Sequence, residues 1–140
     1  MMKAALAGVA GSVAVTLIHQ ATRTISPDAP RLDTLGMRGL ASLAGTPEKA
    51  GSQELYDLAL FGDLAGNGIY FGMAGLFGSR NSMLTGVLLG AAAGIGSVVI
   101  PPRIGLGRDA TNRTPANQAL AIGMYTTGGL VAGAVYHLLD

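Results

Sequence analysis

The sequence contains no cysteine and no tryptophan, and only two histidines among its 140 residues. Without cysteine the chain forms no disulfide, binds no metal through thiolates and carries no lipid on a cysteine side chain. Charged residues make up 12% of the chain, about half of their share in a typical soluble domain. The net charge of +1 provides no overall field that would attract nucleic acid. These absences argue against an ordinary soluble domain and against nucleic acid as a partner.

Apolar residues and glycine dominate what is present, since 49% of the residues are hydrophobic and 22 positions are glycine. Four stretches, residues 4–22, 58–79, 81–102 and 114–139, contain 19, 22, 22 and 26 residues and a single charged residue, Asp63. A helix of about 20 apolar residues crosses the hydrocarbon core of a bilayer. The sequence therefore predicts an all-α polytopic membrane protein, in which residues 1–140 form one domain, a bundle of four transmembrane helices.

The first stretch, residues 4–22, also resembles a secretory signal peptide, because Lys3 precedes an apolar run rich in alanine, valine and glycine. This run ends in Ile18, His19 and Gln20, where a signal peptide would have small residues before its cleavage site. We therefore expect the stretch to be retained as the first membrane span.

The segment of residues 23–57, between the first two spans, carries most of the polar residues. Pro27 and Pro30 disfavour helical backbone for the residues that precede them and should end the first helix. Residues 31–44 then place four leucines on one helical side, at Leu32, Leu35, Leu40 and Leu43. This spacing predicts a short amphipathic helix, which either lies in the membrane interface or packs on the end of the bundle.

Glycine and proline mark the other expected helix boundaries. Gly45 can end the amphipathic helix with a positive φ, and the next helix is expected to begin near Pro47, since proline is favoured in a first turn. The short connection at residues 78–82 predicts that the second and third spans are antiparallel neighbours. Pro101 and Pro102 are expected to stop the third span.

Positive charge is distributed unevenly between the loops. The first and third loops contain seven Lys and Arg residues, at positions Arg23, Arg31, Arg38, Lys49, Arg103, Arg108 and Arg113. The opposite side has only Lys3 and Arg80. Because cytoplasmic loops are enriched in Lys and Arg, the first and third loops are expected in the cytoplasm and both termini outside it. Lys3, ahead of the first span, favours the opposite orientation.

Sixteen glycines lie inside the four spans, where small residues allow helices to approach closely in lipid. They recur at four-residue steps in the third span, at Gly86, Gly90 and Gly94, and in the last span, at Gly129 and Gly133. This pattern predicts helix packing through these glycines, either within one chain or between two copies. We favour packing within the chain.

Asp63 is the one charged residue within a span, where an unpaired carboxylate is costly. Asn67 lies one turn further along the same helical face, and antiparallel spans would bring Asp63 towards His19 and Arg23. One hypothesis is a proton or cation site in which Asp63 changes protonation and His19 relays the proton. The other, which we favour, is a neutral Asp63 held by hydrogen bonds, or an ion pair, that fixes the helix register.

The sequence predicts no metal or cofactor. His19 and His137 lie at the ends of the first and last spans, at opposite membrane surfaces, so they cannot bind one haem within a single chain. A haem with His19 as its single axial ligand is the one arrangement that stays open. The third loop places Arg103, Arg108 and Arg113 beside glycines and a helix start, which suits an anionic lipid headgroup or another phosphate.

The sequence contains neither a nucleophile paired with a general base nor the residue spacing of a metal site, so we do not expect an enzyme. With little mass outside the membrane and much helix surface, we expect an accessory or assembly subunit of a larger membrane complex. Its partners would be the lipid bilayer and other membrane subunits or copies of itself. The alternative is a small oligomeric channel or transporter that uses the intramembrane cluster of His19, Asp63 and Asn67. A membrane enzyme that acts on lipid headgroups through the third loop is a third alternative.

Overall fold

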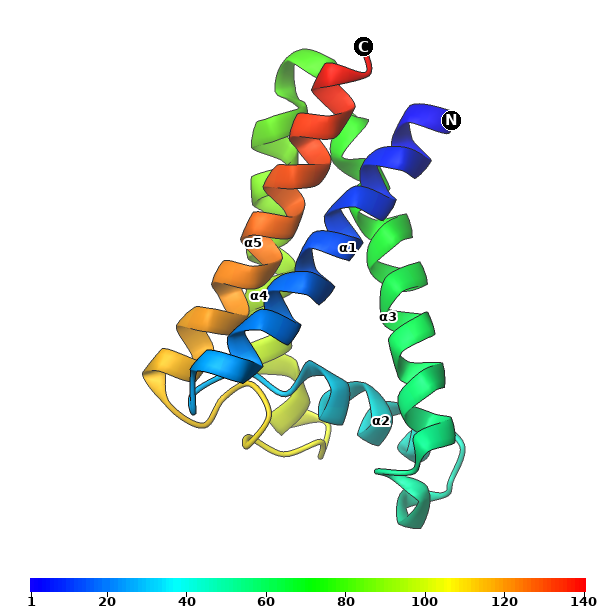
Figure 1. Cartoon of the computed structure of the whole chain (residues 1–140), viewed down its shortest axis with the longest axis vertical. Coiled ribbons are helices and arrows are strands. Elements are labelled where there is room, and N and C mark those ends of the chain that lie inside the picture. Colours follow the sequence, from blue (N-terminus) through cyan, green and yellow to red (C-terminus); the bar gives the residue numbers. More distant parts are fainter.

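The computed structural model describes all 140 residues and is entirely helical, as predicted (Figure 1). Its five α-helices are α1 (Met2–Ile25), α2 (Leu32–Leu43), α3 (Gln53–Gly72), α4 (Ser82–Arg103) and α5 (Pro115–Leu138). Three short 3₁₀ helices lie between them, at Pro47–Lys49, Met73–Gly75 and Ser79–Asn81. The four long helices run alternately up and down, so both termini lie at one end, while α2 crosses the other end (Figure 1).

Three helices are long and apolar enough to cross a membrane: Met2–Ile25, Ser79–Arg103 and Pro115–Leu138. Large apolar side chains face outward on the long helices, and Leu17 and Leu88 are 64% and 62% exposed. Contiguous apolar surface of this kind is rare on soluble monomers and suits contact with lipid. The helix α3 is not among the three, and its acidic residues Glu54, Asp57 and Asp63 distinguish it from them.

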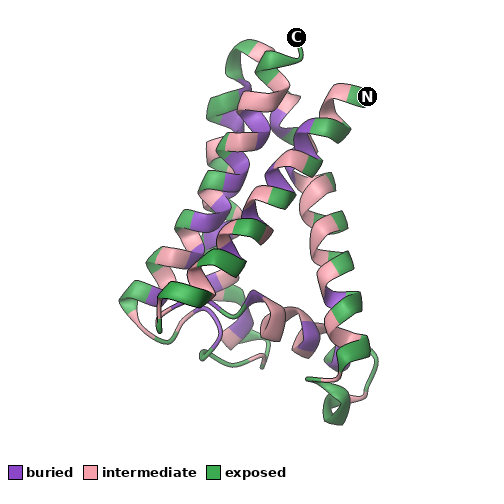
Figure 2. Cartoon of the chain, in the orientation of Figure 1, coloured by how far each residue is buried: buried purple, intermediate pink, exposed green.

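The core lies where α1 packs on α5 and α3, and where α5 packs on α4. Its buried apolar residues include Val15 of α1, Phe71 of α3 and Met124 and Ala132 of α5. Figure 2 shows buried positions where α5 faces α4 and α1, whereas α3 is largely half-buried or exposed. The long helices therefore pack in the order α4, α5, α1 and α3, with α5 between α4 and α1 and with α1 between α5 and α3.

The contact between α4 and α5 is so close that side chains are excluded from part of it. Backbone atoms of the facing helix occupy the place of a Cβ at five glycines: Gly86, Gly90, Gly94, Gly129 and Gly133. A Cβ on Gly86 would overlap the carbonyl oxygen of Gly129, and a Cβ on Gly129 would overlap that of Gly86. Only glycine allows the two backbones to approach this closely.

The helix α3 packs mainly on α1 and α2 and makes few contacts with α4. Ser12 of α1 donates a hydrogen bond to the Leu64 carbonyl of α3 at 2.9 Å, and Gly8 lies against the Gly68 backbone. These contacts hold α3 on α1, and α2 lies between the lower ends of α3 and the other helices (Figure 1). The expected pairing of the second and third spans therefore occurs mainly around the 3₁₀ helix Met73–Gly75, which contacts α4.

The ends of α3 differ from the predicted span of residues 58–79. Pro47 opens only the short 3₁₀ helix Pro47–Lys49, and Gly51, with φ of 103°, separates that helix from α3. The α-helix begins after Ser52, whose side chain accepts a hydrogen bond from the Leu55 N–H. It ends at Gly72, ahead of the turn at Gly78. A helix therefore does begin at Pro47, as predicted, but it is only this 3₁₀ turn, and the Ser52 cap determines where α3 begins.

The helix α4 includes Pro101 and Pro102 and ends at Arg103, one residue beyond the predicted span, so the prolines lie within its last turn. Proline lacks the N–H that bonds to the carbonyl four residues earlier in a helix. The carbonyls of Ser97 and Val98 therefore need other donors at this helix end.

The loop between α4 and α5 provides those donors. The Thr111 hydroxyl donates to the Ser97 carbonyl at 2.5 Å, and the Asn112 amide donates to the Val98 carbonyl at 2.9 Å. Both carbonyls that the prolines leave free are thus hydrogen-bonded, which lets the helix continue and fixes the loop against its end.

Thr111→Val should lower the free energy of unfolding by about 1–3 kcal/mol, because the Ser97 carbonyl then lacks a donor. The loss should be smaller in a Pro101→Ala background, since alanine at position 101 supplies the missing N–H. A double-mutant cycle of unfolding in mixed detergent micelles measures this coupling. Equal losses in the two backgrounds would show that Thr111 stabilises the loop by some other contact.

Candidate functional site: a polar cavity beside Asp63

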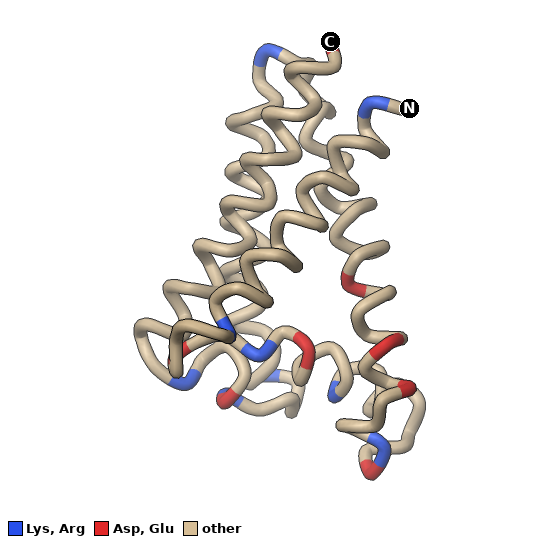
Figure 3. The backbone as a smooth tube through the Cα atoms, viewed as in Figure 1, with Lys and Arg blue, Asp and Glu red and all other residues tan.

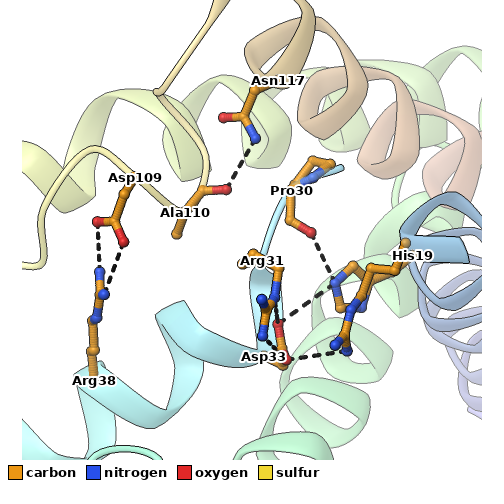
Figure 4. A network of polar contacts seen from close by, with 9 residues as sticks. His19, Pro30, Arg31, Asp33, Arg38, Asp109, Ala110 and Asn117 are labelled. Atoms are coloured by element: carbon orange, nitrogen blue, oxygen red, sulfur yellow. Dashed lines mark hydrogen bonds and ion pairs between the residues drawn. The ribbon is translucent and has the colours of Figure 1, made fainter. Parts of the chain in front are cut away.

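The loops at the α2 end of the molecule pack into an ordered layer that positions the site. Asn117, in the first turn of α5, is completely buried at the centre of this layer. Its side-chain amide donates to the carbonyls of Asp28 and Ala110 at 3.1 and 3.2 Å, and its oxygen accepts from the Arg113 N–H at 3.1 Å. Figure 4 shows the bond to Ala110. One side chain thus joins the first loop, the third loop and α5.

Two further contacts tie the loops together, and Figure 4 shows the first of them. The Arg38 guanidinium of α2 donates two hydrogen bonds to the Asp109 carboxylate, at 2.7 and 2.9 Å. These hydrogen bonds lower the pKa of Asp109 below its ordinary value, against a small opposing effect of burial. The Arg31 N–H donates to the Ala110 carbonyl at 2.9 Å. The path of the chain after α1 is therefore fixed by the third loop.

This fixed path brings Pro30 and Asp33 to the buried side chain of His19 (Figure 4). His19 Nε2 lies 3.1 Å from the Pro30 carbonyl oxygen and 3.9 Å from the Asp33 carboxylate. Because a carbonyl can only accept, Nε2 carries the hydrogen and donates. Arg31 and Arg23 each lie 3.1 Å from Asp33. Burial would raise the pKa of Asp33, but the Arg31 hydrogen bonds and the two arginine charges outweigh it and lower this pKa.

Asp63 lies about halfway along α3, about 15 Å from the start of the helix at the usual rise per residue. Asn67 donates a hydrogen bond to the Asp63 carboxylate at 2.9 Å. No lysine, arginine or histidine lies within ion-pair distance of Asp63. The carboxyl group is therefore held by a neutral neighbour on its own helix.

A small cavity of about 20 Å³ separates α1 from α3 at this level. Six polar side chains line it, together with apolar residues: Thr16, His19, Gln20, Asp33, Tyr56 and Asp63. The Thr16 hydroxyl oxygen is buried and has no hydrogen-bond partner in the protein. On the side towards the chain termini, α1 and α3 are joined by the hydrogen bond from Ser12 to Leu64 and by the contact of Gly8 with Gly68.

The structure places the residues of the predicted intramembrane cluster in one region. His19 and Asp63 line the same cavity, and Asn67 bonds to Asp63. Arg23 pairs with Asp33 and not with Asp63, the partner suggested by the spacing of the spans. Thr16 and Asp33 were not identified from the sequence. Asp33 reaches the cavity only because the loop before α2 turns back against His19, and no spacing along the chain reveals such a turn.

The three arginines of the third loop have different surroundings. Arg113 donates to the Pro27 carbonyl at 2.5 Å and lies 4.0 Å from Asp28, so it joins the two loops. Arg103 and Arg108 are exposed and have no ion pair or side-chain hydrogen bond within the chain. The guanidinium groups of Arg103 and Arg108 are therefore free of partners within the chain, whereas that of Arg113 is not.

No group of three or more His, Asp or Glu side chains lies close enough to hold a metal ion. Comparison with protein-family models, curated proteins and solved structures gives no match to this chain. The function must therefore be argued from the geometry of the molecule itself.

Proposed function

We propose that the chain is a four-span integral membrane protein that serves as an accessory or assembly subunit of a larger membrane complex. The fourth span in this proposal is α3. It is 20 residues long, runs antiparallel to α1 and carries exposed Phe61 and Ile69 on its outer side. Its acidic residue at mid-height, Asp63, lines the cavity between α1 and α3 and not the outer surface.

The distribution of charge supports a single orientation for the four spans. Lys, Arg, Asp and Glu gather at the end where α2 lies (Figure 3). Seven of the nine Lys and Arg residues lie at this end, which supports a cytoplasmic position for it by the positive-inside rule. Both termini then lie outside the cytoplasm. The helix α2, with Met37 and Ala41 buried and Leu43 exposed, lies at the level of the cytoplasmic interface.

The observation that carries the assembly role is an open groove between α3 and α4. On its α4 side the groove is lined by the small residues Ala92, Ala93, Gly96 and Ser97, followed by Ile100 and Pro101 at the helix end. On its α3 side lie Asn67 and Tyr70, and Tyr70 donates to the Leu89 carbonyl at 2.9 Å. Small residues on one helix face, with polar groups opposite, are typical of a surface that receives another transmembrane helix. We propose that a helix of a partner subunit occupies this groove.

A photoreactive amino acid placed at Ala93 in the groove tests this proposal. In native membranes it should cross-link to one defined membrane polypeptide, identified by mass spectrometry. The same amino acid at Val13, which faces outward on α1, serves as the matched control and should react with lipid. Filling the groove with Ala93→Phe should abolish recovery of the partner in mild detergent, whereas Val13→Phe should not.

The alternative is a small oligomeric channel or transporter, favoured by the polar cavity that contains His19 and Asp63. A cross-link from Ala93 to a second copy of the chain, together with a pure homo-oligomer that moves ions in liposomes, would overturn the assembly role in favour of this one. Cross-links from Ala93 to lipid alone would also contradict it.

A further inference from the structure

The cavity between α1 and α3 brings together two polar groups that the assembly role leaves unused. The Thr16 hydroxyl is buried without a partner, and Asp63 accepts one hydrogen bond, from Asn67. A buried polar atom that lacks a protein partner commonly binds an ordered water molecule. The cavity volume of about 20 Å³ exceeds the roughly 10–15 Å³ that one water requires. The cavity thus accommodates one water between Thr16 and Asp63.

The surroundings of Asp63 favour binding of a proton over binding of a metal ion. The ionisable groups that face this region come from each neighbouring element: His19 of α1, Asp33 of α2, Tyr56 of α3 and Tyr125 of α5. The nearest cations, Arg23 and Arg31, are paired with Asp33. An ionised Asp63 therefore has no counter-ion, and a proton neutralises it without any further ligand.

The α2 end of the molecule offers a polar approach to the cavity. Towards the α2 end the cavity is lined by the exposed residue Gln20 and by Asp33, which two arginines keep ionised. Towards the termini, α1 and α3 are in direct contact through the Ser12 hydrogen bond to Leu64 and the approach of Gly8 to Gly68. The polar route to Asp63 therefore runs beside Gln20 and His19.

We propose that this cavity is a proton-binding site, in which Asp63 reversibly takes up a proton delivered from the α2 end through a water molecule bound to Thr16. Uptake converts the carboxylate into a carboxylic acid, and the hydronium that delivers the proton becomes water. Asn67 remains hydrogen-bonded to the oxygen that does not take the proton. The site does not depend on the assembly role, because it requires only the packing of α1, α2 and α3 within one chain.

Infrared difference spectroscopy of the purified full chain in lipid nanodiscs, between acidic and alkaline buffers, tests the site. A carbonyl band of a protonated carboxylic acid should disappear reversibly as the pH rises, and it should shift to lower frequency when D₂O replaces water. Asp63→Asn should abolish the band. The matched control is Asp57→Asn, which removes an exposed carboxylate from the first turns of the same helix and should leave the band unchanged.

Thr16→Val separates the bound water from the carboxyl group itself. The band should persist in this variant, but its shift in D₂O should become slower because the water has lost its protein anchor. Leu17→Val, one position along α1 on the outward face, should leave the exchange rate unchanged. Exchange at the wild-type rate in Thr16→Val would overturn the water-mediated route.

A second measurement on the wild-type chain covers the case in which Asp63→Asn does not fold. An apolar carbodiimide adds to a protonated carboxyl group in apolar surroundings, and mass spectrometry of peptides should locate the adduct at Asp63 and not at Asp33. The adduct should decrease as the pH of labelling rises. An Asp63 that never reacts and gives no carboxylic band, or a band that neither titrates nor exchanges, would overturn the proposal.

Discussion

Gly129→Ala should destabilise the folded bundle by about 3 kcal/mol, the upper part of the range for overpacking a well-packed interface. The added Cβ would overlap the Gly86 carbonyl, and no side-chain rotation relieves a clash with backbone. The helices α4 and α5 would have to separate along the whole contact, which also involves Gly90 and Gly133. In lipid no hydrophobic force between helices compensates for the lost van der Waals contact.

The matched control is Gly123→Ala in the same helix, where a new Cβ meets nothing within 4 Å. Alanine there should leave stability unchanged or raise it by up to about 1 kcal/mol through its higher helix propensity. Unfolding of both variants in dodecyl sulfate mixed micelles gives the comparison. If the two substitutions had equal effects, the close approach of α4 and α5 would not determine the stability of the bundle.

Asn117→Ala should cost about 3 kcal/mol, because it removes the buried side chain that joins the first loop, the third loop and α5. The Asp28 carbonyl and the Arg113 N–H lose their hydrogen bonds to this side chain. The Ala110 carbonyl keeps the bond from the Arg31 N–H, which limits the loss. The same unfolding assay measures the effect.

Gln118→Ala provides the comparison for Asn117, because it removes the adjacent amide and a single hydrogen bond, to Asn112. We expect a loss of about 1 kcal/mol for this substitution. A loss at Asn117 no larger than that at Gln118 would show that the loop layer is held mainly by the Arg38 and Asp109 pair and by Arg113.

The sequence predicts the helices well where long apolar stretches define them. The stretches of residues 81–102 and 114–139 match α4 and α5 to within one residue at each end. The stretch of residues 58–79 misplaces α3, because absence of charge does not define a helix end. The Ser52 cap begins α3 within a polar segment, so that Glu54 and Asp57 belong to the helix.

The candidate site is predictable only in part, since part of it depends on the fold of the loops. Asp63 and Asn67 follow from the cost of polar groups in a span and from their spacing of one turn. The pairing of Asp33 with Arg23 and the isolation of the Thr16 hydroxyl depend on how the first loop packs on the third. The donors to the Ser97 and Val98 carbonyls likewise come from a loop whose folding no helical periodicity describes.

The measurement that tests the account most directly asks whether α3 crosses the membrane. Because the chain contains no cysteine, single-cysteine variants report on one position each. Glu54→Cys lies at the start of α3, Arg80→Cys lies beyond its end, and both positions are exposed. In intact cells a membrane-impermeant thiol reagent should label Arg80→Cys directly and Glu54→Cys only after permeabilisation. Labelling of both positions from the same side would contradict the four-span bundle.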